Sequence, residues 1–254
     1  MATTIEALTF DWYGTLANHR HKSRGSGFSE YLASHGLQSA PWDRTVLFEV
    51  FDYYASFYRP QSSDAEKRMF WTEFTSQLFE RSRVSGSTAS QSEVHAAAIR
   101  DIFGAGCFQL YHDVQPVLHG LKRNGLRLAV ISNWHRGLDS FCFEMNLSGL
   151  LDAVISSADI GIEKPDSRIF HEAVRQLGVK PDRIVHIGDL PHDDFSGAVA
   201  AGLRAILIDR KNKYFLHPNR ISDLFELERQ LDLIAKVDTR HPQSPKTHFP
   251  TDYL

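Results

Sequence analysis

Short apolar segments that end in polar residues recur along this chain, and they restrict its fold more than any other feature. Each segment is rich in Val, Ile, Leu or other apolar residues and is bounded by Gly, Asp, Ser or Asn. The segments are residues 5–10, 126–132, 153–156, 184–187 and 205–208. Strands that are apolar on both faces are typical of a parallel sheet covered by helices on both sides.

Helical patterns lie between these strand segments. They cover residues 113–123, 166–177 and 194–201, and glycines follow the last two at Gly178 and Gly202. Glycine directly after a helix is a common termination signal. The alternation of strands and helices predicts an α/β fold with a doubly wound, Rossmann-like parallel sheet.

The segment of residues 17–109 interrupts this alternation, because it contains no convincing buried strand. Helical patterns cover residues 27–35, 43–58, 64–82 and 90–103, and aromatic side chains are dense among them. We therefore expect an inserted all-helical cap domain with a small core of its own. The predicted division is a catalytic core of residues 1–16 and 110–237, the cap of residues 17–109, and a polar C-terminal tail of residues 238–254.

Composition excludes several classes of protein. The chain has 254 residues, of which 42% are hydrophobic and 23% charged, and its formal charge is -3. That length can bury one large core plus a smaller lobe. There is no basic surplus for nucleic acid or an anionic membrane, and no apolar run approaches the roughly 20 residues of a membrane helix.

The same features predict where the protein is found. Cys107 and Cys142 are expected to be reduced thiols, and the first residues lack the basic leader and long apolar run of a signal peptide. We expect a soluble, cytoplasmic protein, either a monomer or a homodimer, that binds a small molecule.

Polar residues follow four of the predicted strands. In an open parallel sheet, ligands bind where the carboxyl ends of the strands meet, so these residues are expected to converge on one edge. Considered singly, each residue is as typical of a helix cap or a solvated surface as of a site. Their joint occurrence at strand ends favours a site. They are Asp11, Ser132, Asn133, Lys164, Asp189, Asp193 and Asp194.

This set of side chains suits chemistry on a phosphate ester. The carboxylate of Asp11 can attack phosphorus and form an aspartyl-phosphate. A dianionic phosphate repels that carboxylate, and Mg²⁺ held by carboxylate oxygens would offset the repulsion. Lys164 would balance the remaining charge. Ser132 and the backbone N–H groups after it could hold phosphate oxygens at a helix N-terminus.

Four short motifs resemble those of the haloacid dehalogenase superfamily. They are Asp11-Trp12-Tyr13-Gly14-Thr15, Val130-Ile131-Ser132-Asn133, Lys164-Pro165, and Gly188-Asp189 followed by Asp193-Asp194. The resemblance covers residues 5–16 and about 110–210 of the core. It extends to the subgroup that inserts a helical cap directly after the first strand.

The resemblance implies a role for each matched position. Asp11 would be the nucleophile, and Ser132 and Lys164 would hold the phosphate. Mg²⁺ would be bound by Asp11, Asp189 and the backbone carbonyl of Tyr13, with Asp194 as a direct or indirect partner. The remaining matched residues would line the substrate pocket, together with Tyr13. They are Gly14, Thr15 and Asn133.

Tyr13 departs from the pattern of the superfamily's phosphatases. Those enzymes usually carry a second Asp at this position, which protonates the leaving group and then activates water. Tyrosine, with a pKa near 10, is a poor substitute near pH 7. A histidine from the following segment, His19 or His21, could supply the proton instead.

Tyrosine at this position resembles the 2-haloacid dehalogenases of the superfamily, which use no metal and have Ser and Asn in the fourth motif. This chain keeps Asp189 and Asp194, and three clustered carboxylates would repel one another without a cation. The sequence therefore predicts a Mg²⁺-dependent phosphatase acting on a small phosphorylated metabolite. A metal-free 2-haloacid dehalogenase that forms an ester on Asp11, and a catalytically weak binding module, are the alternatives.

Overall fold

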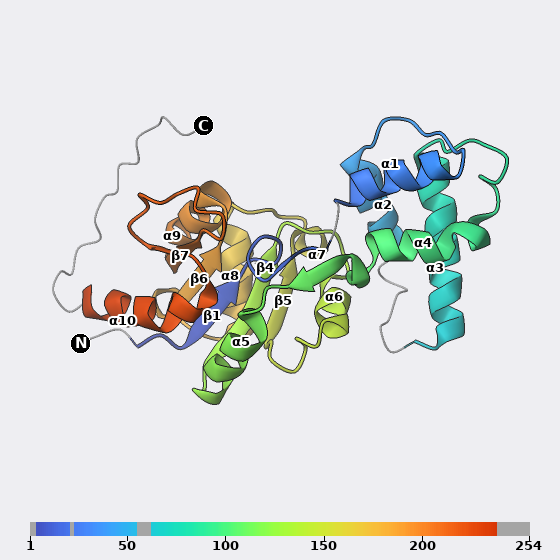
Figure 1. Cartoon of the computed structure of the whole chain (residues 1–254). Coiled ribbons are helices and arrows are strands. Elements are labelled where there is room, and N and C mark those ends of the chain that lie inside the picture. The colour runs from blue at the N-terminus through green and yellow to red at the C-terminus, as the bar shows by residue number, and fades with distance from the viewer. Residues whose placement is uncertain (1–3, 21–22, 55–61, 238–254) are drawn as a thin grey trace.

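The computed structural model describes residues 4–20, 23–54 and 62–237, and its core is a six-stranded parallel sheet (Figure 1). The strand order is β5-β4-β1-β6-β7-β8, and every neighbouring pair is parallel. This confirms the predicted doubly wound α/β fold and its five strand segments. The strands are β1 Ala7–Phe10, β4 Arg127–Ser132, β5 Ala153–Ser156, β6 Ile184–Gly188, β7 Arg204–Ile208 and β8 Arg220–Ile221.

Both faces of the sheet are covered, which explains why the strands are apolar throughout. On β1, Leu8 and Phe10 belong to one apolar cluster, whereas Ala7 belongs to the other. The first cluster includes residues of α5 (Val114–Arg123), α6 (Leu138–Glu144) and α10 (Leu227–Val237). The second includes residues of α8 (Ser167–Leu177) and α9 (Gly197–Ala200). Because successive side chains of a strand point to opposite faces, two clusters require an unbroken apolar run.

Four helices form a second part of the molecule, beside the sheet (Figure 1). They are α1 Arg24–Ser34, α2 Arg44–Tyr54, α3 Asp64–Arg81 and α4 Ser92–Phe103. Aromatic and aliphatic side chains such as Phe28, Phe74 and Ile99 are buried among them. Helices α1, α3 and α4 begin and end within three residues of their predicted bounds. Helix α2 begins within one residue of its predicted start, and the predicted residues 55–58 lie outside the described part of the chain.

A two-stranded antiparallel ribbon connects the sheet to the helices. It pairs β2 (Ala17–His19) with β3 (Phe108–Leu110). The expectation of no strand within residues 17–109 was therefore wrong at both ends of that segment. Each strand is only three residues long and its partner is distant in sequence, so neither shows a periodic pattern.

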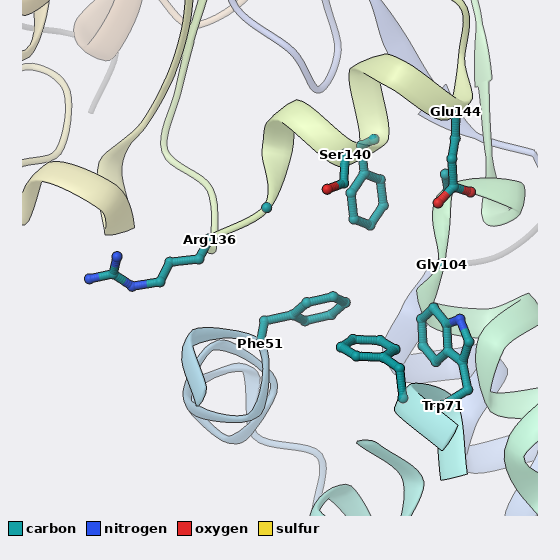
Figure 2. Close-up of a pocket in the computed structure, with 10 residues that line it drawn as sticks. Phe51, Trp71, Gly104, Arg136, Ser140 and Glu144 are labelled. Atoms are coloured by element: carbon teal, nitrogen blue, oxygen red, sulfur yellow. The ribbon is translucent and has the colours of Figure 1, made fainter. Parts of the chain in front are cut away.

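The apolar cluster of the helices continues into the sheet instead of forming a separate core. The Phe51 ring of α2 lies 6.2 Å from the Phe141 ring of α6, and Phe141 lies 5.9 Å from Phe108. Figure 2 shows this junction, where Phe51 and Trp71 face Ser140 and Glu144 across a small pocket of about 20 Å³. The expected separate small core is thus one end of a continuous apolar region.

The segment after β6 also differs from expectation. The helix predicted at residues 194–201 begins earlier, as a π-helical turn over Pro191–Ser196 that continues into α9. Helices α6 and α10 were not predicted. The other short helical elements are α7 Ser157–Ile160 and 3₁₀ turns at Ala105–Cys107, Pro181–Arg183 and Leu224–Glu226.

Two further expectations can be compared with the structure only in part. Within the described residues, no helix combines the length and the apolar character that crossing a bilayer would demand. The predicted tail of residues 238–254 lies outside the described residues.

Candidate active site

Asp11 lies at the carboxyl end of β1, the central strand, where its side chain is buried. Its Oδ1 atom accepts a hydrogen bond of 2.9 Å from the Ser132 hydroxyl at the end of β4. The same oxygen accepts a bond of 2.6 Å from the Lys164 ammonium. The parallel register of β1 and β4 brings these strand ends together, as the sequence predicted for this edge.

Lys164 is buried and joins two carboxylates. Its Nζ atom donates to Asp11 at 2.6 Å, to Asp194 at 2.5 Å and to the backbone carbonyl of Ile131 at 3.1 Å. Asn133 holds the backbone of Lys164 through a reciprocal pair: its Oδ1 accepts from the Lys164 N–H and its Nδ2 donates to the Lys164 carbonyl. Asn133 therefore positions the lysine, and it also lines the adjoining cavity.

Asp194, and not Asp193, joins the buried acidic group. Asp194 is buried, and its second oxygen accepts from the Leu190 N–H at 2.9 Å. Asp193 is paired with the exposed His192 and only borders the cavity. The π-helical turn explains the difference, because it directs one of two adjacent carboxylates inward and leaves the other at the cavity wall.

Asp189 completes a group of three carboxylates. Asp11, Asp189 and Asp194 each offer an oxygen within 4.8 Å of the others. The Oδ1 atom of Asp189 is buried and has no hydrogen-bond partner among the described residues. A buried carboxylate oxygen without a donor is costly, and a cation with oxygen ligands would satisfy it. These residues therefore fit a Mg²⁺ site.

The pKa values of the group follow from burial and mutual repulsion. Burial, together with Asp11 and Asp194, raises the pKa of Asp189 to about 7. Burial also raises the pKa of Asp11, despite the opposing effect of Lys164. Although burial alone would lower the pKa of Lys164, its two carboxylate partners raise it, so the lysine stays charged. One lysine does not neutralise three acids, which again favours a bound cation.

Gly14 and Thr15 lie in the turn after Asp11 and are not among the residues that line the cavity. Gly14 has a φ of +88°, and a Cβ atom there would lie 2.4 Å from an Asp189 oxygen. Its role in the structure is to let the turn approach Asp189. The predicted substrate contacts of Gly14 and Thr15 stay predictions, as does the metal contact of the Tyr13 carbonyl.

Tyr13 and His19 border a cavity of about 510 Å³ that also reaches Asp11, Ser132 and Lys164. Tyr13 is partly exposed, and burial and Asp189 raise the pKa of its hydroxyl. Burial and the positive charge of Arg24 lower the pKa of His19 to about 4. A neutral imidazole at pH 7 is a weak proton donor, which disfavours His19 as the general acid. His21, the other histidine considered, lies outside the described residues.

Three buried residues that touch this region were not found from the sequence. His186 on β6 lies 3.3 Å from Asp194 through Nε2 and 2.9 Å from the Thr9 hydroxyl through Nδ1. Arg24 of α1 lines the cavity, although it lies far from the motifs in sequence. His186 and Thr9 could have been found as polar residues inside the otherwise apolar strands β6 and β1. For Arg24 the sequence carried none.

A parallel sheet whose central strand is followed by a buried carboxylate, beside a lysine and two further acids, is typical of an α/β enzyme that binds its substrate at the carboxyl ends of the strands. Comparison with known proteins agrees. The chain belongs to the haloacid dehalogenase-like hydrolase family, which it matches over residues 5–202.

Several relatives are similar over much of the chain. The haloacid dehalogenase-like hydrolase domain-containing protein 3 of Bos taurus is 29% identical over 213 residues, which cover 80% of this chain and 82% of the relative. A glyceraldehyde 3-phosphate phosphatase of Methanopyrus kandleri is 32% identical over 135 residues, which cover 50% of this chain and 56% of the relative. A phosphoserine phosphatase of Thermus thermophilus is 35% identical over 104 residues, 41% of this chain and 42% of the relative.

Solved structures share the fold. The 2-haloacid dehalogenase of Pseudomonas syringae pv. Tomato DC3000 superposes with a TM-score of 0.60 at 24% identity, covering 91% of this chain and 99% of that one. The haloacid dehalogenase-type phosphatase of Thermococcus onnurineus superposes with a TM-score of 0.56 at 21% identity, covering 89% and 98%. One is a dehalogenase and the other a phosphatase, so the fold alone does not separate these two activities.

Proposed function

We propose that this protein is a Mg²⁺-dependent phosphatase that hydrolyses a small phosphorylated metabolite through an aspartyl-phosphate on Asp11. The observation that carries the proposal is the third carboxylate, Asp189, whose buried Oδ1 atom has no partner in the described part of the chain. In a metal-free mechanism nothing would bind this oxygen, whereas in a Mg²⁺-dependent mechanism the ion would. The phosphatase names of relatives that match part of the chain support the same reading.

The residues at the sheet edge would divide the reaction as follows. Asp11 attacks phosphorus, the bond from phosphorus to the alcohol oxygen breaks, and the alcohol leaves with a proton from water. A second water then hydrolyses the acyl phosphate, which releases inorganic phosphate and restores the carboxylate. Lys164 and Ser132 hold the nucleophile and the transferring phosphate. Asp11, Asp189, Asp194 and the Tyr13 carbonyl would hold Mg²⁺, whose charge would offset the repulsion between carboxylate and phosphate.

We further propose that residues 17–109 act as a cap on a core of residues 1–16 and 110–237. The cavity supports this division, because its lining combines residues of α1 and α2 and of the β2–β3 ribbon with residues at the edge of the sheet. A lobe in that position would exclude water and select the substrate. The reaction is proposed for the cytoplasm, where the thiols of Cys107 and Cys142, both free, would stay reduced.

Tyr13 favours a second candidate, a metal-free 2-haloacid dehalogenase. A halide leaves without a proton, so that reaction needs no acid at this position. In it, Asp11 would attack the carbon that carries the halogen and form an ester, which water hydrolyses.

The test is a pair of assays on the purified full-length chain. Release of phosphate from p-nitrophenyl phosphate is measured with Mg²⁺ and again after exhaustive chelation, beside release of chloride from 2-chloropropionate. We expect phosphate release that falls by at least about a hundredfold on chelation and returns when Mg²⁺ is added back. Chloride release that is indifferent to chelation, without phosphate release, would replace the first proposal by the second.

A further inference from the structure

Arg24 carries a buried positive charge that no described carboxylate neutralises. Only 8% of the residue is exposed, and it lies at the first position of α1. Its Nη1 atom donates to His135 Nε2 at 3.0 Å, and its Nη2 atom donates to the Phe103 carbonyl at 2.8 Å. Its guanidinium lies 4.9 Å from the ring centre of Phe108 and 5.1 Å from that of Trp134.

The polar partners of Arg24 are all neutral. His135 donates from Nδ1 to the Arg136 carbonyl, so its Nε2 atom is free to accept from Arg24, and burial keeps its pKa well below the usual value. Burial raises the pKa of Cys107, so this neighbour of Arg24 is a thiol. Rings and neutral acceptors stabilise a guanidinium only partly, and a buried cation without a counter-ion is unfavourable.

The unpaired charge borders the same cavity as Asp11. Arg24 and Asp11 both line the space of about 510 Å³. The Nε atom of Arg24 is buried and has no hydrogen-bond partner in the described residues. Arg44 of α2 lines the cavity too, as an exposed side chain whose guanidinium lies over the Phe48 ring. The volume of the cavity suits a whole small molecule rather than phosphate alone.

In the described part of the chain, the acidic residues of the cavity, apart from Asp11, do not pair with the two arginines. Glu163 and Asp193 come from the segments that also carry Lys164 and Asp194. Within residues 4–20, 23–54 and 62–237, neither forms an ion pair with Arg24 or Arg44. The cavity therefore has Lys164 among the acids beside the nucleophile, and a separate pair of arginines, Arg24 and Arg44, on the helices. A ligand with two anionic groups would match both.

We propose that Arg24, assisted by Arg44, binds a second anionic group of the substrate, a carboxylate or a second phosphate, while Asp11 and Lys164 engage the reacting phosphate. This inference rests on the proposed phosphatase function and narrows its substrates to phosphate esters with a further negative charge. Each Nη atom of Arg24 carries two N–H groups and uses one of them for His135 or Phe103, so the guanidinium can donate further charge-assisted hydrogen bonds to either group.

The test compares ligands that differ by one anionic group. The first pair is 3-phosphoglycerate and glycerol 3-phosphate, which differ by a carboxylate. The second pair is fructose 1,6-bisphosphate and fructose 6-phosphate, which differ by a phosphate. Dissociation constants are measured by calorimetry with Mg²⁺ on the Asp11→Asn chain, so that turnover does not consume the ligand. We expect the more anionic member of at least one pair to bind about tenfold more tightly or better, and that pair identifies the group.

Substitutions then locate the effect. In the same background, Arg24→Met should reduce the affinity ratio of that pair to below about threefold, and Arg24→Lys should keep part of it, because it keeps the charge. Arg44→Gln should lower the ratio as well, and its exposed position makes it the reserve variant if Arg24→Met does not fold. Arg68→Gln, an exposed change on α3 outside the cavity, is the matched control and should leave the ratio intact.

Two results would overturn the inference: ratios near one for both pairs in the parent chain, or a ratio that survives both Arg24→Met and Arg44→Gln. Hydrolysis of p-nitrophenyl phosphate by the native chain, measured separately, keeps the two proposals apart. If that ester is hydrolysed but neither pair is discriminated, only the second-anion site fails. If the pairs are discriminated without hydrolysis, only the phosphatase proposal fails.

Discussion

At the scale of single residues, the site depends on how one lysine is shared among acids. Lys164 lies 2.6 Å from Asp11 and 2.5 Å from Asp194, whereas Asp189 has no such partner at its buried oxygen. The lysine therefore holds two carboxylates in place and leaves a third to require another cation. Among three residues of identical chemistry, Asp189 is therefore the one whose environment most favours a bound metal ion.

Replacing Asp11 by Asn should abolish turnover and leave the fold intact. An amide is not nucleophilic, although it is close in shape and can still accept from Lys164 and Ser132. We expect phosphate release to fall by at least about a thousandfold, while the circular dichroism spectrum stays unchanged. A variant that retained native activity would rule out the aspartyl-phosphate mechanism.

Replacing Tyr13 by Asp should change activity according to the leaving group. In the native protein the hydroxyl of Tyr13 is a weak acid, because burial and Asp189 raise its pKa. We therefore expect native activity to be low on alkyl phosphates and much higher on p-nitrophenyl phosphate, whose leaving group needs little protonation. Tyr13→Asp should raise kcat/KM on alkyl phosphates by about tenfold or more and change it little on the aryl ester.

The Tyr13 result also distinguishes the two candidate functions. For a dehalogenase, a new carboxylate beside Asp11 should reduce chloride release and create no phosphatase activity. If no substrate responds to the substitution, Tyr13 has a structural role only.

At the scale of elements, two turns after strands bring the acids together. The turn after β1 approaches Asp189 closely because Gly14 has no Cβ atom and adopts a φ of +88°. The π-helical turn after β6 directs Asp194 toward Lys164. Both turns follow strands that are paired in the sheet, so the register of the sheet sets the distance between them.

Gly14→Ala should damage the metal site more than the fold. The added methyl group would lie 2.4 Å from an Asp189 oxygen, so Asp189 must move. Gly125→Ala is a matched control, because Gly125 has a φ of +80° and no atom within 4 Å of the added group. Both variants should lose about 1 kcal/mol of stability from the unfavourable φ. Only Gly14→Ala should weaken Mg²⁺ binding, by about tenfold or more in calorimetry. Equal Mg²⁺ affinity in the two variants would contradict this role for Gly14.

At the scale of the whole molecule, the acidic group links metal binding to stability. Folding brings oxygens of three carboxylates within 4.8 Å of one another. Their mutual repulsion destabilises the folded state and offsets part of the stability that the two apolar clusters of the sheet provide. Because the unfolded chain does not hold them together, a cation that binds them stabilises only the folded state.

Mg²⁺ should therefore raise the melting temperature, and Asp189→Asn should remove the effect. At a concentration about a hundred times its dissociation constant, the ion should add about 2.7 kcal/mol. For a chain of this size that corresponds to a rise of roughly 5–10 °C. Asp182→Asn, an exposed change outside the site, should keep the full rise. A rise of equal size in the Asp189→Asn protein, measured by calorimetric melting, would place the ion elsewhere.

Local patterns in the sequence were sufficient to predict five of the six strands of the parallel sheet, most of the helices and the motif residues at the strand ends. The continuous apolar run in residues 5–10 predicted a buried strand, and the parallel sheet then placed Asp11, Ser132 and Lys164 at one edge. These features depend on neighbours in sequence and on a general rule of sheet geometry, so they needed no knowledge of packing.

Only the tertiary structure decided which acid joins Lys164, how the β2–β3 ribbon forms, and where Arg24 lies. Asp193 and Asp194 are adjacent and chemically identical. The π-helical turn orients the side chain of Asp194 toward Lys164 and that of Asp193 toward the cavity wall. The strands of the ribbon, β2 and β3, are too short to show a period, and they exist because distant segments pair. Arg24 belongs to no motif and acquires its unpaired charge only when α1 packs against His135 and the surrounding rings. Contacts between residues far apart in sequence decide all three, and no local pattern of residues records such contacts.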